Sequence, residues 1–330
     1  MKIDFDARKN MSVLAYYYSK LKGLSNKIYG MHIIYKVVKN WYDVIFFKLG
    51  IKKRIIIKVR NGHNINIDNI EAYKQFRESK EILIERINEL KSKGYEINLN
   101  EKENIIEIKK FDRNIKFYFD DVIQAINTIN MIKENFIDEQ FKNLDVKAKD
   151  VVDIGANIGD TAIYFALKGA NHVYAFEPYP YSYEIALKNI ELNNLKDKIT
   201  MLNEGCGKSG FITISSSIKS YAGNDLKDSK IGKKIKINSL EEITTRFKLN
   251  NALLKSDCEG CEYDIILRAS EKTLKKFNLL VVDYHYGYKN LVKKLREANF
   301  KVKYNLPKYF RGIRSENKDM YVGLILAELI

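Results

Sequence analysis

Apolar runs and helical stretches alternate along the second half of the chain. The runs cover residues 151–154, 173–176, 199–203, 253–256 and 279–284, and helical spacing begins near residues 160, 181, 263 and 289. Strands that alternate with helices in this way predict an α/β fold, in which helices cover both faces of a mainly parallel sheet. Ligands of such sheets bind at the carboxyl ends of the strands, so the residues that end each strand are the first candidates for chemistry.

The region before residue 138 follows a different pattern. Residues 55–60 and 63–67 are two strand-like runs around Asn61-Gly62, which is a hairpin turn sequence. Residues 69–93 have helical spacing, and Gly94 ends them. Three short alternating runs and one helical stretch follow, at residues 95–99, 105–109, 115–119 and 122–136. The sequence therefore predicts a small α+β unit over residues 55–137, ahead of a catalytic domain over residues 138–330.

The first segment, residues 1–54, is basic and aromatic. Between residues 12 and 49 it mixes large apolar side chains with lysines and has no proline, which is typical of one or two amphipathic helices broken near Gly23 and Gly30. Residues 1–60 hold 14 Lys and Arg against three Asp. Such a helix can lie on a membrane surface, or it can pack its apolar face on the catalytic domain. The charge favours an anionic partner, such as a nucleic acid, a phospholipid surface or a phosphorylated substrate.

Composition narrows the class of protein. The 330 residues are 45% hydrophobic and 12% aromatic, which excludes a disordered or collagen-like chain. The three cysteines, Cys206, Cys258 and Cys261, argue against a disulfide framework and for a reducing compartment. No apolar stretch reaches about 18 residues, and the N-terminus lacks the apolar core of a signal peptide. We therefore expect a cytoplasmic protein whose contact with a membrane is peripheral.

A loop with two glycines follows the first strand of the α/β region. Gly155 and Gly159 allow a tight turn and a close approach of a ligand to the backbone, and the next helix offers free N–H groups at its N-terminus. The candidate ligand-binding positions of this loop are Asp153, Gly155, Ala156, Asn157, Gly159 and Thr161. The alternative is a structural turn that binds nothing.

The loop and the end of the second strand together favour S-adenosylmethionine over NAD. A dinucleotide fingerprint needs glycine at two positions that Asn157 and Asp160 occupy. Asp153 instead suits a cationic group, and S-adenosylmethionine carries a sulfonium and an ammonium but no phosphate. Glu177, which precedes Pro178, ends the second strand 22 residues beyond the first glycine of the loop. An acid at this place can accept hydrogen bonds from both ribose hydroxyls, so Glu177 and Pro178 complete the predicted cofactor site.

Acids and a histidine end the fourth and fifth strands. Asp257, Glu259 and Glu262 lie within six residues of one another after the fourth strand. Glu262 has another explanation, because acids at a helix N-terminus interact favourably with the helix dipole. His285 ends the fifth strand, and the ordinary histidine pKa of about 6.5 makes it the leading candidate for a general base, with a structural histidine as the alternative. We predict that Asp257, Glu259 and His285 face the substrate and that Asp257 also contacts the cofactor.

These motifs, in this order and spacing, resemble the FkbM family of S-adenosylmethionine-dependent methyltransferases. The resemblance covers roughly residues 138–305. It is carried by Asp153-Ile154-Gly155-Ala156-Asn157-Ile158-Gly159-Asp160, Phe176-Glu177-Pro178, Asn238-Ser239-Leu240-Glu241-Glu242, Leu254-Lys255-Ser256-Asp257-Cys258-Glu259-Gly260-Cys261-Glu262 and Asp283-Tyr284-His285. The sequence departs from the usual pattern at Cys258 and Cys261, where Val and Ala are common, and at Asp283, where Glu is common.

The resemblance implies a class I methyltransferase fold. This is a Rossmann-like α/β architecture with a mainly parallel seven-stranded sheet, here with an N-terminal α+β extension. It also implies O-methylation of a hydroxyl on a sugar, a glycolipid or a polyketide-like molecule, so the expected partner is a small-molecule or glycan acceptor. Residues 1–137 lie outside the matching core, and the family does not explain their charge.

Two other functions and a metal site are the alternatives. An RNA methyltransferase would bind tRNA or rRNA through the basic N-terminal unit, although no Asn-Pro-Pro-Tyr or other base-methylating motif follows the fourth strand. A non-catalytic scaffold would bind the cofactor without needing the acids and the histidine. Cys258-x-x-Cys261 has zinc-ligand spacing, but a second pair is missing and the family resemblance explains both cysteines as small packing residues. No metal is therefore predicted.

Overall fold

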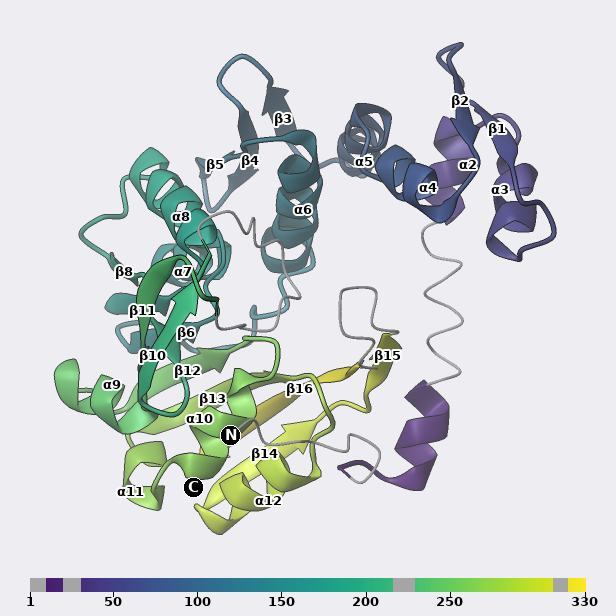
Figure 1. Cartoon of the computed structure of the whole chain (residues 1–330). Helices are drawn as coiled ribbons and strands as arrows, with labels where there is room; N and C mark the ends of the chain where they lie inside the picture. The colour runs from purple at the N-terminus through teal and green to yellow at the C-terminus, as the bar shows by residue number, and fades with distance from the viewer. Residues whose placement is uncertain (1–9, 20–30, 216–228, 311–319) are drawn as a thin grey trace. The chain divides into compact units, whose positions relative to one another are not determined.

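The computed structural model describes residues 10–19, 31–215, 229–310 and 320–330 (Figure 1). By their contacts, these residues form two compact units. The larger unit contains residues 10–19 together with Gln140–Ile330, and the smaller unit contains residues 31–139. The three-part division suggested by the sequence, with boundaries after residues 54 and 137, stays a prediction.

One sheet organises the larger unit. Its strands lie in the order β14, β16, β13, β12, β6, β7 and β8, and β15 pairs with β16 as an eighth strand. The bounds are β6 Asp150–Ile154, β7 His172–Phe176, β8 Ile199–Leu202, β12 Ala252–Ser256, β13 Phe277–Tyr284, β14 Phe300–Tyr304, β15 Lys308–Phe310 and β16 Met320–Leu329. Strand β16 is antiparallel to its partners, whereas β13, β12, β6, β7 and β8 are parallel to one another. The expected mainly parallel sheet of the class I methyltransferase fold is confirmed.

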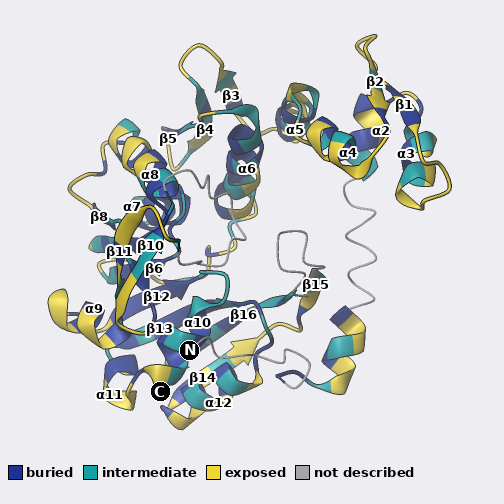
Figure 2. Ribbon diagram, in the orientation of Figure 1, coloured by how far each residue is buried: buried dark blue, intermediate teal, exposed yellow. Residues whose placement is uncertain are grey.

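Helices follow the parallel strands as the apolar pattern predicts. Helices α7 (Asp160–Leu167) and α8 (Pro180–Leu192) follow β6 and β7, and α10 (Cys261–Arg268) and α12 (Lys289–Glu297) follow β12 and β13. Two shorter helices, α9 (Leu240–Arg246) and α11 (Glu271–Leu274), precede β12 and β13. All five residues of β12 and four of the five in β6 are buried (Figure 2). Burial on both faces explains why these strands read as continuous apolar runs.

The short N-terminal stretch at residues 10–19 packs into the core of the larger unit. Residues 13–19 are helical, and Met11 and Ala15 lie in the same buried cluster as Leu280 and Tyr288. The Asn10 side chain donates to the carbonyl of Tyr286 at 3.1 Å. Of the two alternatives for the basic segment, residues 10–19 thus follow the second, in which the apolar face packs on the catalytic domain.

A second sheet in the larger unit has no counterpart in the sequence prediction. It has the order β10 (Gly210–Ile214), β11 (Lys233–Asn238) and β9 (Gly205–Cys206). Strands β10 and β11 are antiparallel, and β11 and β9 are parallel. The alternating apolar positions of β11 were a usable signal for a strand, whereas β9 is too short to carry any periodicity.

The smaller unit has the predicted hairpin and short strands. Strand β1 (Ile55–Lys58) is antiparallel to β2 (Asn64–Ile67), and β3 (Ile97–Asn100), β4 (Ile105–Lys110) and β5 (Arg113–Tyr118) form a three-stranded sheet. The helices are α2 (Met31–Val37), α3 (Trp41–Lys48), α4 (Ile70–Arg77), α5 (Lys80–Ser92) and α6 (Val122–Ile132), which continues into a π-helical turn, η1 (Lys133–Ile137). The single helix predicted over residues 69–93 is wrong. Ser79 has extended backbone and begins a separate helix there, as its N-cap preference allows.

Candidate functional site

The glycine loop after β6 is shaped by its neighbours in the fold. Gly155 has φ +78°, and a Cβ built there would lie 1.8 Å from the backbone oxygen of Asp257. Gly159 has φ +81° and begins α7, where a Cβ would lie 3.3 Å from the Ala186 Cβ. Asn157 also has a positive φ, +47°. The loop therefore needs glycine for close backbone packing, in addition to any need of a ligand.

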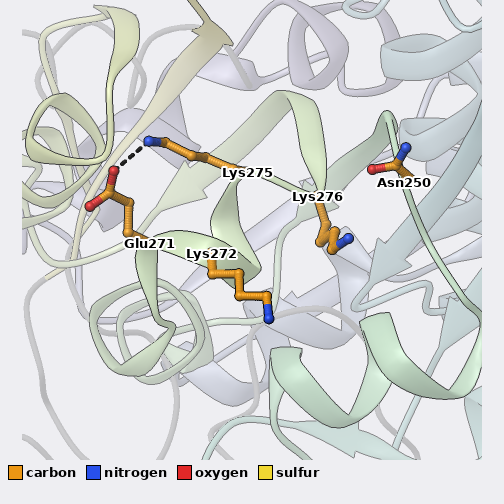
Figure 3. Close-up of a pocket in the computed structure, with 5 residues that line it drawn as sticks. All are labelled: Asn250, Glu271, Lys272, Lys275 and Lys276. Atoms are coloured by element: carbon orange, nitrogen blue, oxygen red, sulfur yellow. Dashed lines mark hydrogen bonds and ion pairs between the residues drawn. The ribbon is translucent and has the colours of Figure 1, made fainter.

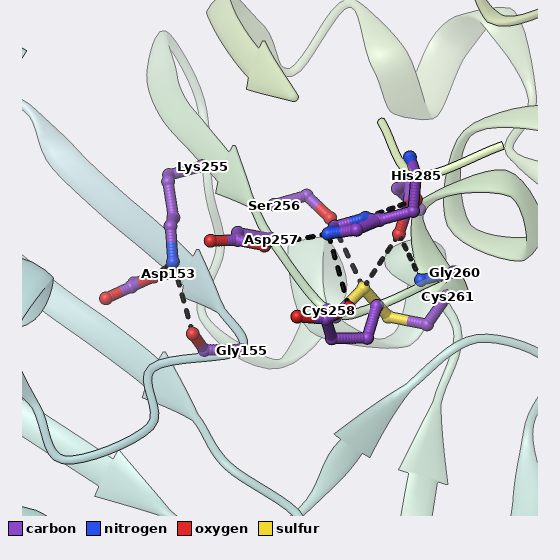
Figure 4. The surroundings of a disulfide bond; sticks show 11 residues. Asp153, Gly155, Lys255, Ser256, Asp257, Cys258, Gly260, Cys261 and His285 are labelled. Carbon is purple, nitrogen blue, oxygen red and sulfur yellow. Dashed lines mark hydrogen bonds and ion pairs between the residues drawn. A yellow bond between two sulfur atoms is a disulfide. The ribbon is translucent and has the colours of Figure 1, made fainter. Parts of the chain in front are cut away.

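A buried ion pair lies at the start of this loop. The Asp153 carboxylate, which is fully buried, is 2.9 Å from the Lys255 Nζ and accepts a hydrogen bond of 2.5 Å from the Thr161 hydroxyl. Lys255 also donates to the carbonyl of Gly155 at 3.1 Å, and Figure 4 shows its side chain reaching from β12 toward both groups. Burial opposes the charged form of Lys255, but the nearby carboxylates of Asp153 and Asp257 outweigh burial and raise the pKa of the lysine.

Asp153 therefore has a different environment from the one anticipated. The sequence interpretation gave its carboxylate to a cationic ligand, whereas in the fold both of its oxygens face groups of the chain itself. Lys255 was missed by the sequence reasoning. A lysine inside the apolar run of a central strand was the available signal, because such a residue is seldom buried without a partner.

Glu177 lies at the carboxyl end of β7, beside the loop. It is buried, and its two oxygens accept hydrogen bonds of 2.9 Å from the backbone N–H groups of Asn157 and Tyr179. Burial raises the pKa of Glu177 to about 7, although these two hydrogen bonds and Lys255 favour the charged form. The carboxylate is thus held rigidly, and each oxygen keeps a lone pair for a further donor.

The segment after β12 carries the predicted catalytic acids. Its first residue, Asp257, continues the sheet through a hydrogen bond of 3.0 Å from its N–H to the carbonyl of Ile154 on β6. Glu259 and Gly260 both have positive φ, +56° and +118°, so the chain turns sharply before α10. The Asp257 side chain is 43% exposed and that of Glu259 is 23% exposed. Both carboxylates can therefore meet a molecule that binds at this edge of the sheet.

His285 lies behind these two acids. Its Nε2 is 3.5 Å from an oxygen of Asp257 and 3.5 Å from an oxygen of Glu259, and its Nδ1 is 2.9 Å from an oxygen of Glu262. Burial opposes the charged form of the ring, but the three carboxylates outweigh it and raise the pKa of His285 well above its ordinary value. The premise of an unshifted histidine pKa is therefore wrong, while a base role for His285 stays a prediction.

Glu262 has a larger role than the helix dipole explains. Its side chain is fully buried, and it accepts hydrogen bonds from the backbone N–H groups of His285, at 3.1 Å, and Gly260, at 2.8 Å. The same carboxylate holds the imidazole Nδ1. Glu262 thus fixes both the turn that carries the acids and the orientation of the histidine ring.

Cys258 and Cys261 form a disulfide across this turn (Figure 4). Both residues pack against the core of the larger unit, as expected, but the sequence analysis did not predict the bridge between them. The turn brings their Cα atoms to 5.4 Å, and Cα separations of about 4.4–6.8 Å permit a disulfide. Cys206 is buried and free, so the chain has one local bridge and no framework of bridges.

A pocket of about 510 Å³ lies away from these residues (Figure 3). Its lining is Asn250, Glu271, Lys272, Lys275 and Lys276. Asn250 lies two residues before β12 and Lys276 lies directly before β13, so the pocket lies at the amino ends of these strands. The candidate site lies at their carboxyl ends, where ligands of parallel sheets bind. The pocket is therefore no candidate for the cofactor.

The fold brings the predicted residues to one edge of the sheet. The first loop and Glu177 follow β6 and β7, whereas Asp257 and His285 follow β12 and β13. Ala156 donates its N–H to the carbonyl of Phe176 at 3.0 Å, which ties the loop to the end of β7. The carbonyl of Pro178 accepts from the Asn203 side chain at 3.1 Å.

Comparison with known proteins agrees with this arrangement. Residues 153–302 match the methyltransferase FkbM domain. Over 54 residues, 16% of this chain and 18% of the relative, the sequence is 44% identical to a ribosomal protein L11 methyltransferase of Carboxydothermus hydrogenoformans. The chain thus spans about a fifth of that curated relative.

Solved structures give weaker likenesses. The methyltransferase FkbM from Methylobacillus flagellatus matches with a TM-score of 0.36 and 16% identity, over 62% of this chain and 55% of that one. The TrmK of M. capricolum, in complex with S-adenosylhomocysteine, matches with a TM-score of 0.35 and 17% identity, over 55% of this chain and 62% of that one. On the family match and the sheet order, the chain carries an FkbM methyltransferase domain, which belongs to the S-adenosylmethionine-dependent class.

Proposed function

We propose that the protein is an S-adenosylmethionine-dependent O-methyltransferase that acts on a hydroxyl of a sugar, a glycolipid or a related small molecule. The observation that carries the proposal is the placement of Asp257 and Glu259. Both are partly exposed carboxylates, and each lies 3.5 Å from the buried His285 at the edge of the sheet that also holds the glycine loop. A proton acceptor beside the cofactor edge is what transfer to a hydroxyl needs.

The cofactor fits the donor set of this edge. The Glu177 carboxylate, held by two backbone N–H groups, is suited to a ribose diol, and Pro178 lies next to it. Backbone at Gly155, Ala156, Asn157 and Gly159 would face the methionine end. Asp153 and Thr161 act indirectly, because Asp153 holds Lys255 and Lys255 holds the Gly155 carbonyl. Asp257, the exposed acid, is then the group that meets the ammonium.

Catalysis depends on positioning and on proton removal. When bound, S-adenosylmethionine supplies a methyl group on a positively charged sulfur. Asp257 and Glu259 orient the acceptor hydroxyl in line with that methyl group, and orientation of this kind provides much of the rate. Asp257 would accept the hydroxyl proton when the acceptor oxygen takes the methyl group that the cofactor supplies. We assign His285 to positioning these acids, since its side chain is only 4% exposed, so that Asp257 takes the base role first predicted for His285.

The decisive experiment separates the acceptor classes. The full chain is incubated with methyl-labelled S-adenosylmethionine and with separated glycan, lipid and RNA fractions of the native cell. Label in a glycan or glycolipid fraction, stable to mild base, supports an O-methyl ether. Label in RNA alone contradicts the proposal, and calorimetry with S-adenosylmethionine and NAD tests the cofactor independently.

RNA methylation is the second candidate function, and the smaller unit motivates it. In that unit, residues 48–54, here called the basic loop, are all exposed and contain three lysines and one arginine. Tyr42 and Phe46 of α3 are exposed as well, so rings and cations are available to a single-stranded RNA.

An anionic membrane surface suits the basic loop better than RNA does. Leu49 and Ile51 are each 67% exposed, and stacking on bases gives no role to two aliphatic side chains between cations. At a lipid interface, by contrast, aliphatic side chains enter the headgroup boundary while lysines attract anionic lipids. In the part of the chain that the structure describes, no helix is both long and apolar enough to cross a bilayer. We therefore propose peripheral contact through this loop.

A further inference from the structure

Three metal-binding groups meet at the ends of β12 and β13. The carboxylates of Asp257 and Glu259 and the imidazole of His285 each offer one ligand atom, and these three atoms lie within 4.8 Å of one another. Figure 4 shows the His285 ring beside Asp257, at the exit of the strand. Cis ligands of an octahedral cation with bonds of about 2.1 Å lie about 3 Å apart. The distances between the three atoms therefore need to shorten by less than about 2 Å. Rotation of the half-exposed Asp257 side chain can bring them that much closer.

The histidine is held as a metal ligand would be held. Its Nδ1 is 2.9 Å from the fully buried Glu262, so the ring orientation is set from behind. Its Nε2 then points between Asp257 and Glu259, at 3.5 Å from each. Hydrogen bonds from nitrogen to oxygen are usually about 2.7–3.2 Å long, so neither contact is a good hydrogen bond. A carboxylate behind an imidazole whose other nitrogen faces further ligands is the usual outer-sphere arrangement of protein metal sites.

The charges of the cluster favour a cation. Three carboxylates, Asp257, Glu259 and Glu262, surround one imidazole. Lys255, the buried cation nearby, already forms its ion pair with Asp153 at 2.9 Å. Three carboxylates beside one imidazole give the cluster a negative local field, and such a field attracts a cation.

We propose that Asp257, Glu259 and His285 bind one divalent cation of the Mg²⁺ or Mn²⁺ type. The two carboxylates suit such a cation, the imidazole favours Mn²⁺ over Mg²⁺, and three protein ligands leave positions open for the oxygens of a second molecule. This part of the inference rests on the proposed O-methyltransferase function. The open positions then take the acceptor hydroxyl and a neighbouring oxygen, such as the two oxygens of a sugar diol. The cation then lowers the pKa of the hydroxyl, and the released proton passes to the free oxygen of Asp257 or to water. The sequence analysis placed these three residues together but predicted no metal there.

The test measures cation binding without cofactor or acceptor. The full chain is stripped with a chelator, desalted and titrated with Mn²⁺ while electron paramagnetic resonance follows the free ion. Manganese is the probe because it prefers oxygen ligands, so thiols of the chain do not compete well. We expect one Mn²⁺ per chain. Asp257→Asn and Glu259→Gln should each weaken binding at least tenfold, and Glu262→Gln should weaken it about 10–100-fold through the histidine orientation.

Controls separate this outcome from misfolding and from failure of the proposed function. Glu271→Gln, which alters an acid of α11 outside the cluster, should bind Mn²⁺ as the unaltered chain does, and thermal unfolding should show that Asp257→Asn remains folded. Unaltered protein that binds no Mn²⁺, or Asp257→Asn that binds it normally, overturns the proposal. Methyl transfer that persists in excess chelator would contradict the cation site but support the O-methyltransferase function. Mn²⁺ binding without transfer to any glycan or lipid would support the cation site but contradict that function.

Discussion

Charge is handled in opposite ways at the candidate site and at the basic loop. At the site, Asp153, Glu262 and Lys255 are buried, and each has defined partners within about 3 Å. In the basic loop, every residue from 48 to 54 is exposed. Lys52 pairs with Asp43, and the flanking Leu49 and Ile51 have most of their surface in solvent.

The difference separates two kinds of functional argument. A buried charge must be compensated at a fixed position, so its geometry carries chemical information. An exposed charge contributes through the summed field, which salt screens over about 10 Å. Substitutions at the site should therefore have large effects that do not depend on salt, and substitutions in the loop should have small effects that do.

Loss of the exposed acid of the site should have the largest effect. Asp257→Asn should lower kcat on the identified acceptor by roughly 10²–10⁴, because the proton acceptor is removed. The same change should also weaken cofactor binding if Asp257 meets the ammonium. Steady-state kinetics and calorimetry measure the two effects. If the His285→Gln variant keeps the kcat of the unaltered enzyme, the histidine has no part in catalysis.

Breaking the buried ion pair between Lys255 and Asp153 should have the next largest effect, a loss of stability. Lys255→Met leaves the carboxylate of Asp153 buried without its cation, and we expect a loss of about 3–5 kcal/mol in the free energy of unfolding. The exposed pair of Lys275 and Glu271 offers the matched control. Lys275→Met should change the free energy of unfolding by less than about 1 kcal/mol. Urea denaturation measures both free energies. Equal losses in the two variants would contradict the distinction between buried and exposed charges.

Removal of Glu177, the acid proposed to bind the ribose, should have an intermediate effect. Glu177→Ala should weaken S-adenosylmethionine binding by about 1–3 kcal/mol, since it removes charge-assisted hydrogen bonds to a diol. S-adenosylhomocysteine should lose the same amount, because the two ligands share the ribose. Calorimetry measures both affinities, and unchanged values would mean that another group binds the ribose.

Cofactor affinity should depend on pH through the same residue. The pKa of Glu177 is raised to about 7, so its carboxyl group is mostly protonated at pH 6 and mostly ionised at pH 8. In the proposed role the ionised form accepts both ribose hydroxyls, so affinity should rise with pH and be about tenfold weaker at pH 6 than at pH 8. Glu177→Gln cannot ionise and should show a flat profile over this range. A sloping profile in that variant would assign the titration to another group.

The smallest effects should come from the basic loop. Lys53→Ala should weaken binding of the full chain to anionic phospholipid vesicles by about 1 kcal/mol, and higher salt should reduce this difference. Leu49→Ser should weaken binding by about 1 kcal/mol at every salt concentration, because it removes apolar contact. Vesicle flotation measures both, with neutral vesicles as the comparison. Equal binding to neutral and anionic vesicles would refute an electrostatic contact.

Local patterns in the sequence determined much of the fold. Continuous apolar runs identified β6, β7, β8, β12 and β13, because a strand buried on both faces has no polar alternation. Asn61-Gly62 identified the first hairpin, since only a few residues accept its turn geometry. The helix break at Ser79 was missed, because helical spacing on its two sides continues across it.

The glycine loop and the acids at the strand ends were likewise legible in the sequence, because each lies within a few residues of a recognisable strand. The sequence did not show which of these side chains contact one another. Lys255 faces Asp153 because β12 and β6 are parallel neighbours in a register that places these two residues side by side. Glu262 holds His285 because the turn at Gly260 directs α10 back toward the end of β13. The sequence itself determined which chemical groups the site contains, and the tertiary structure decided which of them meet, because register and turn geometry join residues that lie far apart along the chain.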